Sequence, residues 1–140
     1  MACTSPPEAI RKHIQHTPYE IQVVAGSDLT IDPEVLAHVK AAHIRCFPDE
    51  VPESGYESME QFLDRITWMT EPQDCTWYLL WHGVASKLKL VGLATTVPYT
   101  KSLYGFNLGV DPSFRKRGLG GRLMHEAQLE AIRRGSLCVL

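Results

Sequence analysis

The spacing of apolar and polar residues predicts one strand and two helices in the first half of the chain. Residues 19–24 alternate between polar and apolar side chains and then become apolar, which is the pattern of a strand. Asp32 and Pro33 are typical of a helix start, and the apolar positions after them keep a helical spacing to about Phe47. Ser58 and Gln61 match a capping box, so we expect a second helix over residues 58–66.

The period of the pattern then shortens to two. Residues 75–81, 88–99 and 103–110 form three β-type runs joined by short connections, which predicts an antiparallel meander. We expect Pro98 to end the second of these strands, because proline has no N–H to donate within a sheet.

A third helix is predicted after a glycine-rich turn. Its apolar stripe consists of Leu119, Leu123, Met124, Ala127 and Ala131. Gly135 is the expected C′ residue of this helix, and residues 136–140 begin one more strand. The resulting order, β-α-α-β-β-β-α-β, predicts an α/β domain of the α+β type with a mixed sheet.

Length and composition fit a single domain. The chain has 140 residues, of which 44% are hydrophobic. We divide it into a flexible N-terminal arm, residues 1–18, and a domain over residues 19–140. The net charge of −2 makes a dedicated nucleic-acid binder an unfavoured class. Neither an apolar run of the ~20 residues that a membrane span needs nor a secretion signal is recognisable, so we expect a cytoplasmic protein, with the nucleus as the alternative.

Cysteine and histidine spacing predicts no metal site. The four cysteines form no C-x-x-C pair, and we expect them to be reduced thiols. His38 and His43 are five residues apart, which does not place them on one face of a helix.

The segment 108–123 carries the clearest chemical signal. It runs from a strand through a proline turn and the pattern Arg115-x-x-Gly118-x-Gly120 into a helix. Glycines let the backbone approach a ligand, the first N–H groups of a helix point at it, and the basic side chains add positive charge. This combination predicts a site for phosphate groups. The alternative interpretation is a glycine-rich turn that caps a helix beside solvated arginines.

Two common phosphate-binding motifs do not fit this segment. A nucleotide P-loop would continue with Gly-Lys-Ser/Thr, and a dinucleotide fingerprint would sit in a βαβ unit rather than after a meander. Instead the segment resembles the acetyl-coenzyme A (acetyl-CoA) signature of the GNAT superfamily of N-acetyltransferases, through Val110, Pro112, Arg115, Gly118, Gly120 and Leu123.

The resemblance implies a function and a set of binding residues. It implies transfer of an acetyl group from acetyl-CoA to a primary amine by direct attack, without a metal. The backbone N–H groups of residues 116–121 would hold the pyrophosphate, residues 108–110 would pair with the pantetheine arm, and the N–H of Val110 would polarise the thioester carbonyl. The predicted CoA-binding residues are Leu108, Gly109, Val110, Arg115, Lys116, Arg117, Gly118, Leu119, Gly120 and Gly121.

The sequence departs from the family pattern where catalysis is concerned. The family often has a carboxylate on its fourth strand, whereas this chain offers Tyr104 and Asn107 there. The family's tyrosine acid belongs to a helix after the fifth strand, and the present sequence stops before that helix. We therefore expect a fold that is cut after its fifth strand, and we assign no catalytic residue.

Charge distribution suggests where an acceptor would bind. Between Asp49 and Asp74 lie eight acidic side chains and one arginine, so a cationic acceptor such as a lysine side chain, a polyamine or an arylalkylamine is the hypothesis. A solvated acidic helix face explains this charge equally well.

Two other functional classes stay open. One is a CoA-binding or interaction module without catalysis, and the other is a weak nucleic-acid binder that uses residues 115–117 and 133–134. We also expect homodimerisation through the edge of the strand at residues 136–140, because an apolar strand edge pairs readily with another chain.

Overall fold

The structure is a computed structural model that describes residues 18–50, 58, 61, 75–83 and 87–139. Almost all of the predicted N-terminal arm, residues 1–17, lies outside this described part.

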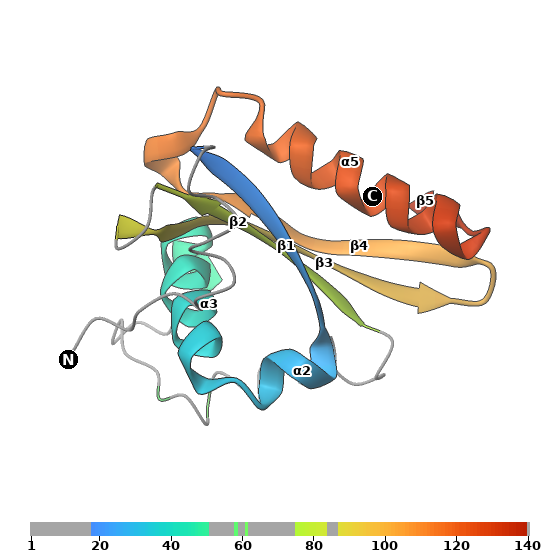
Figure 1. Cartoon of the computed structure of the whole chain (residues 1–140), viewed down its shortest axis with the longest axis horizontal. Coiled ribbons are helices and arrows are strands. Elements are labelled where there is room, and N and C mark those ends of the chain that lie inside the picture. The colour runs from blue at the N-terminus through green and yellow to red at the C-terminus, as the bar shows by residue number, and fades with distance from the viewer. Residues whose placement is uncertain (1–17, 51–57, 59–60, 62–74, 84–86, 140) are drawn as a thin grey trace.

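A five-stranded mixed sheet forms the centre of the molecule (Figure 1). The strands follow one another in the sheet in chain order. Neighbouring strands are antiparallel as far as β4, and β5 runs parallel to β4. The predicted meander and the mixed sheet are therefore confirmed. The strands are β1 (Tyr19–Ala25), β2 (Thr76–His82), β3 (Lys89–Tyr99), β4 (Ser102–Val110) and β5 (Leu137–Val139).

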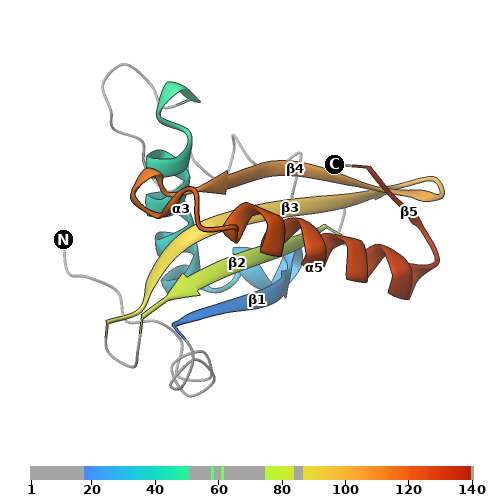
Figure 2. The ribbon, with the colours of Figure 1, turned by 90° about the horizontal axis from the view of Figure 1, so that it is seen from above.

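One long helix covers each face of the sheet (Figures 1 and 2). Helix α3 (Pro33–Cys46) packs on one face, where its apolar stripe meets buried side chains such as Trp77 and Trp81. Helix α5 (Leu119–Arg134) packs on the other face against Tyr78 and Leu80. Because side chains alternate along a strand, the continuous apolar run of β2 supplies both of these cores.

Local sequence signals set the helix ends. The Asp32 carboxylate accepts a hydrogen bond from the Val35 N–H at 3.1 Å, and Pro33 occupies the first turn of α3. Ser58 and Gln61 form the predicted reciprocal capping box, with bonds of 2.9 and 3.1 Å. The body of that predicted helix lies outside the described residues. The turn-type residues before Asp32 form a short helix that was not predicted, α2 (Gly26–Thr30).

The C-terminal end of α5 is closed by a Schellman motif. Gly135 has a φ of 66° and its N–H donates to the Ile132 carbonyl, while the Ser136 N–H donates to the Ala131 carbonyl. The chain then reverses into β5, so both the predicted C′ glycine and the predicted strand are confirmed.

The prediction that Pro98 ends its strand is wrong. Strand β3 continues to Tyr99, and Pro98 lies opposite Leu103 of β4. Strand β2, the other neighbour of β3, begins at Thr76, opposite Thr96. Pro98 therefore has a partner strand on one side only, which is a position where a missing N–H is tolerated.

Candidate functional site

Strand β4 carries a bulge in the middle of its length. Gly109 lies opposite Leu93 and Phe106 lies opposite Thr95, so two residues of β4, Asn107 and Leu108, occupy the interval that Ala94 alone spans on β3. Asn107 has a φ of 53°, a conformation that asparagine tolerates better than most residues. Sequence reasoning did not predict this bulge.

Beyond its first residues, β4 has a free edge. Strand β5 pairs with Ser102, Leu103 and Tyr104 only, and no other described residue continues the ladder on that side. The edge from Gly105 to Val110 is therefore available to a ligand that binds as an added strand.

The peptide groups of Val110 point toward this free edge. The Asp111 N–H donates to the Val91 carbonyl at 2.7 Å, while Val110 lies opposite Gly92. Since hydrogen-bonded and non-bonded pairs alternate in an antiparallel ladder, the N–H and C=O of Val110 face away from β3. The Arg115 Nε donates to the Val110 carbonyl at 3.0 Å, which ties the end of β4 to the following turn.

That turn forms a backbone concavity. A short 3₁₀ helix, η3 (Pro112–Phe114), leads into Lys116 and Gly118, which both have left-handed φ angles, 64° and 75°. Left-handed residues alternating with others turn successive N–H groups inward, which is the anion-binding geometry called a nest. Helix α5 begins at Leu119, and its first N–H groups have no acceptor within the helix.

Glycine keeps the concavity accessible. A Cβ added at Gly118 or at Gly121 would meet no atom within 4 Å, so open space lies in front of the backbone there. The left-handed φ of Gly118 is also strained for any other residue.

A cavity of about 360 Å³ brings most of the predicted binding residues together. Eight of the ten line it: Leu108, Gly109, Val110, Arg115, Lys116, Gly118, Leu119 and Gly120. Arg117 is not among the lining residues, because its Nη1 donates to the Tyr19 hydroxyl at 3.0 Å and its guanidinium lies 5.1 Å from the Phe114 ring centroid. Gly121 is also not among them, although it belongs to the same helical turn.

Helix α3 supports the site through an ion pair that sequence reasoning missed. Arg45 donates from Nε to the Asp111 carboxylate at 2.8 Å and from Nη2 to the Leu90 carbonyl at 2.7 Å. Asp111 is only 3% exposed, and it also accepts from the Ser113 N–H and lies 3.5 Å from the Lys89 ammonium. Burial opposes its ionisation, yet these partners hold the pKa of Asp111 below its usual value. Only the placement of Asp111 just before Pro112 could have hinted at this role.

The same end of α3 presses against β4. A Cβ added at Gly109 would lie 2.5 Å from Phe47 Cζ and 3.0 Å from Cys46 Cβ. Gly109 is therefore required for close packing rather than for its φ angle. Burial, with the nearby Asp111 charge, raises the pKa of the Cys46 thiol to about 11, so this thiol is neutral at pH 7.

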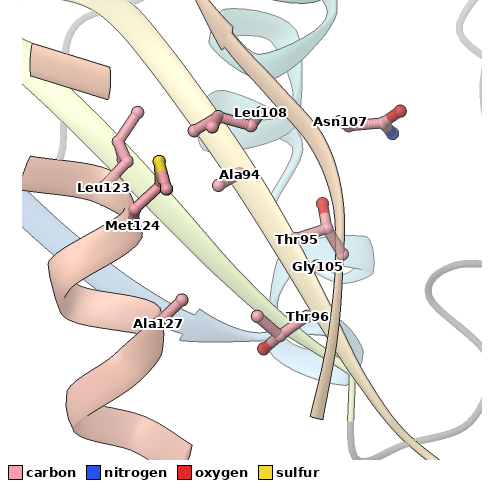
Figure 3. A pocket seen from close by; sticks show the side chains of 9 residues that line it. All are labelled: Ala94, Thr95, Thr96, Gly105, Asn107, Leu108, Leu123, Met124 and Ala127. Atoms are coloured by element: carbon pink, nitrogen blue, oxygen red, sulfur yellow. The ribbon is translucent and has the colours of Figure 1, made fainter. Parts of the chain in front are cut away.

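A second cavity, of about 90 Å³, lies between α5 and strands β3 and β4 (Figure 3). It shares Leu108 with the first cavity. Its walls are mainly apolar, and the side chains of Ala94, Met124 and Ala127 converge on it.

No carboxylate or histidine is found among the described residues that line the two cavities. Of the two polar residues that the sequence offered on β4, Asn107 lines the second cavity, and Tyr104 contacts Tyr99 edge-to-face with ring centroids 6.0 Å apart. The described lining of these two cavities therefore gives no residue on which to place the proton transfers.

The two arginine clusters lie at opposite ends of α5 and do not form one basic surface. Arg133 and Arg134 pair with Glu130 at 3.0 and 3.5 Å, in the last turn of the helix, whereas residues 115–117 precede its first turn. This separation weakens the nucleic-acid alternative.

The described residues offer neither a membrane-spanning helix nor a metal site. No helix there is both long and apolar enough to cross a membrane. No group of three or more His, Cys, Asp or Glu side chains there is arranged to hold a metal ion.

Comparison with known families gives one match over most of the chain. The family model described as Acetyltransferase (GNAT) family matches residues 36–140. A sequence comparison with curated proteins gives no significant match.

Solved structures share the fold at low sequence identity. A GNAT family acetyltransferase from Staphylococcus aureus is 18% identical with a TM-score of 0.58, and the match covers 88% of this chain and 84% of that one. A GCN5-related N-acetyltransferase from Ralstonia eutropha is 21% identical with a TM-score of 0.55, covering 87% and 82%. A proposed acetyltransferase from Pyrococcus horikoshii is 19% identical with a TM-score of 0.52, and the match covers 86% of this chain but 36% of that longer one.

Proposed function

This chain belongs to the acetyltransferase (GNAT) family, and from that premise we propose that it transfers an acetyl group from acetyl-CoA to a primary amine by direct attack. The observation that carries the proposal is the single cavity that joins the free edge at Val110 to the nest at Lys116 and Gly118. A long ligand with a phosphate group and an amide-containing arm would contact both parts at once.

Different segments of the cavity lining would bind different parts of CoA. The backbone N–H groups of residues 116–121 would hold the pyrophosphate, supported by the positive end of the α5 dipole. The free edge at residues 108–110 would pair with the amides of the pantetheine arm. The open space in front of Gly118 and Gly121 leaves room for the phosphates to reach the backbone.

The reaction makes one N–C bond and breaks one C–S bond. The amine lone pair attacks the thioester carbon, the thiolate of CoA leaves, and the proton lost by the amine balances the one that the thiolate takes up. The N–H of Val110 would stabilise the negative charge on the carbonyl oxygen, because it faces the free edge. A lysine-type amine has a pKa of ~10.4, so roughly one molecule in a few thousand is neutral at pH 7 and a proton acceptor is needed.

We further propose a cationic acceptor bound near the acidic segment between Asp49 and Asp74. Most of that segment lies outside the described residues, so its charge alone supports the proposal. Replacing Glu50, Glu53 and Glu57 with glutamine is expected to raise the KM for a diamine and to leave the KM for acetyl-CoA unchanged. Unchanged kinetics with every amine would contradict the idea.

Calorimetry and thiol release test the proposed function in two steps. Titration with CoA and acetyl-CoA should show binding, and no heat at submillimolar ligand would contradict any CoA-dependent function. Thiol release from acetyl-CoA in the presence of an amine panel then separates an enzyme from a non-catalytic CoA-binding module.

Two lesser proposals concern assembly and location. Leu137 on β5 and Ile132 in the last turn of α5 are 72% and 73% exposed, which supports dimerisation through this corner. Sedimentation as a monomer at high concentration would argue against it. We also propose a cytoplasmic location, which fractionation would test against a nuclear one.

A further inference from the structure

We propose that the second cavity holds the tail of the acyl group, so that the preferred donor is an acyl-CoA longer than acetyl, in the propionyl to butyryl range. The inference rests on the proposed function, because it needs a CoA thioester bound along β4.

The second cavity lies farther along β4 from the nest than the larger cavity does. The larger cavity runs from the nest at Lys116 and Gly118, past Val110, to Leu108. The second cavity begins at Leu108 and extends to Gly105, farther along β4 from the nest. A ligand with its phosphates in the nest and its arm paired along residues 108–110 therefore has its far end directed at the second cavity.

The lining of the second cavity is mainly apolar. Ala94, Leu123 and Ala127 are at most 6% exposed and present apolar surface, and the half-buried Met124 lines the cavity beside them (Figure 3). Three lining residues are polar. The Thr96 hydroxyl bonds to the Tyr78 hydroxyl at 3.1 Å, Asn107 points away from Ala94 and Met124 (Figure 3), and Thr95, whose buried hydroxyl has no partner, alternates with Ala94 along β3 and so faces the other side of the sheet. Such walls favour an alkyl chain over a charged or strongly polar group.

The second cavity is larger than an acetyl group requires. Small residues at positions 94, 105 and 127 leave about 90 Å³ open, several times the ~10–15 Å³ that one water needs. A cavity of this size holds more than the one methyl group of an acetyl donor. The acyl tail takes no part in the bond changes, which stay those of amine attack and thiolate departure.

Equilibrium binding tests the inference without knowledge of the acceptor. Dissociation constants are measured by calorimetry for CoA, acetyl-CoA, propionyl-CoA and butyryl-CoA. Each buried methylene is expected to tighten binding by about fourfold. A flat or weakening series from acetyl to butyryl would overturn the inference. Failure of free CoA itself to bind would instead overturn the proposed function.

Variants of Met124 test the place of the tail. Met124→Phe should narrow the cavity and reduce the preference for butyryl-CoA over acetyl-CoA. Met124→Ala should keep that preference and extend it to acyl chains longer than butyryl. His125→Phe adds similar bulk at the next, exposed position of α5 and is the matched control. Equal butyryl-to-acetyl ratios in Met124→Phe, His125→Phe and the parent protein would place the tail elsewhere and contradict the proposal.

Discussion

The guanidinium of Arg45 lies 2.8 Å from the carboxylate of Asp111, and the two residues are 66 positions apart in the chain. Arg45 stands at the end of α3, and Asp111 directly follows Val110, whose N–H faces the free edge of β4. The contact therefore fixes the end of one helix to the strand end from which the candidate oxyanion donor projects. The side chain of Asp111 is only 4% exposed, so this contact is made largely out of water.

Removal of Arg45 is expected to cost far more stability than removal of Lys89. Arg45→Met leaves a buried carboxylate without its closest donor, which should lower the free energy of unfolding by about 1.5–3 kcal/mol. Lys89 is 3.5 Å from Asp111 and 48% exposed, so Lys89→Met should cost less than about 1 kcal/mol. Urea denaturation of both variants measures the difference. Equal losses would show that charge near Asp111, and not the Arg45 hydrogen bonds, is what matters.

Asp111 should give the protein a specific sensitivity to acid. Its pKa is lowered in the folded protein, because the Ser113 N–H, Arg45 and Lys89 outweigh the effect of burial. A depressed carboxyl pKa contributes stability that is present above the unfolded value, 3.8, and is lost as the pH falls through the folded value.

Thermal unfolding between pH 6 and pH 2.5 checks this linkage. Asp111→Asn should be less stable than the parent protein at pH 6, and the gap between them should close as the pH falls below about 4. Glu130→Gln is the positive control, since Glu130 also has a lowered pKa, through arginines at the far end of α5, and its gap should close with falling pH in the same way. A gap between Asp111→Asn and the parent that stays constant with pH would contradict the assignment.

Gly109 and Phe47 should be energetically coupled. Gly109→Ala places a Cβ 2.5 Å from Phe47 Cζ, so overpacking is expected to cost about 1–3 kcal/mol. Phe47→Ala loses packing by itself but removes that clash. The double variant Gly109→Ala/Phe47→Ala should lose less free energy of unfolding than the sum of the two single losses, as measured by denaturation in a double-mutant cycle. Strict additivity would mean that α3 does not press on β4 at this point.

The two left-handed residues of the nest should respond in opposite directions to substitution. Gly118→Ala adds about 1–2 kcal/mol of backbone strain and should weaken CoA binding by roughly tenfold if the nest deforms to relieve it. Lys116→Gly removes a strain of the same kind and should stabilise the fold by up to about 1 kcal/mol. Thermal melts and calorimetry with CoA measure both effects. Loss of stability in Lys116→Gly would show that its side chain, and not its backbone, has the larger role.

Local signals in the sequence were enough to predict most of the fold. The cap at Asp32, the capping box at Ser58 and the turn at Gly135 depend on residues within a few positions of one another, and all three are found. The unusual backbone at Gly118 was also within reach, because glycine spacing reports backbone conformation, whereas the left-handed Lys116 was not predicted. Features that depend on a residue far away in the sequence could not be predicted. Pro98 is tolerated because β2 begins only at Thr76, opposite Thr96, which no pattern around Pro98 records.

The supporting parts of the candidate site show the same limit. Arg117 looked like a phosphate-binding charge, yet its partner is Tyr19, 98 residues away. The bulge at Asn107 depends on the register between β3 and β4, and the Arg45–Asp111 contact depends on the packing of α3. Sequence spacing located the backbone that would bind CoA, whereas only the packed structure shows what holds that backbone in place.

The most direct test is a titration of ¹⁵N-labelled protein with CoA, followed by amide chemical shifts. The central claim is that backbone N–H groups at the end of β4 and the start of α5 bind the cofactor. It predicts that the largest shifts fall on Val110 and on residues 116–121, with smaller changes at the C-terminal end of α5. Binding of CoA with its largest shifts elsewhere, or no shift at millimolar CoA, would contradict the claim.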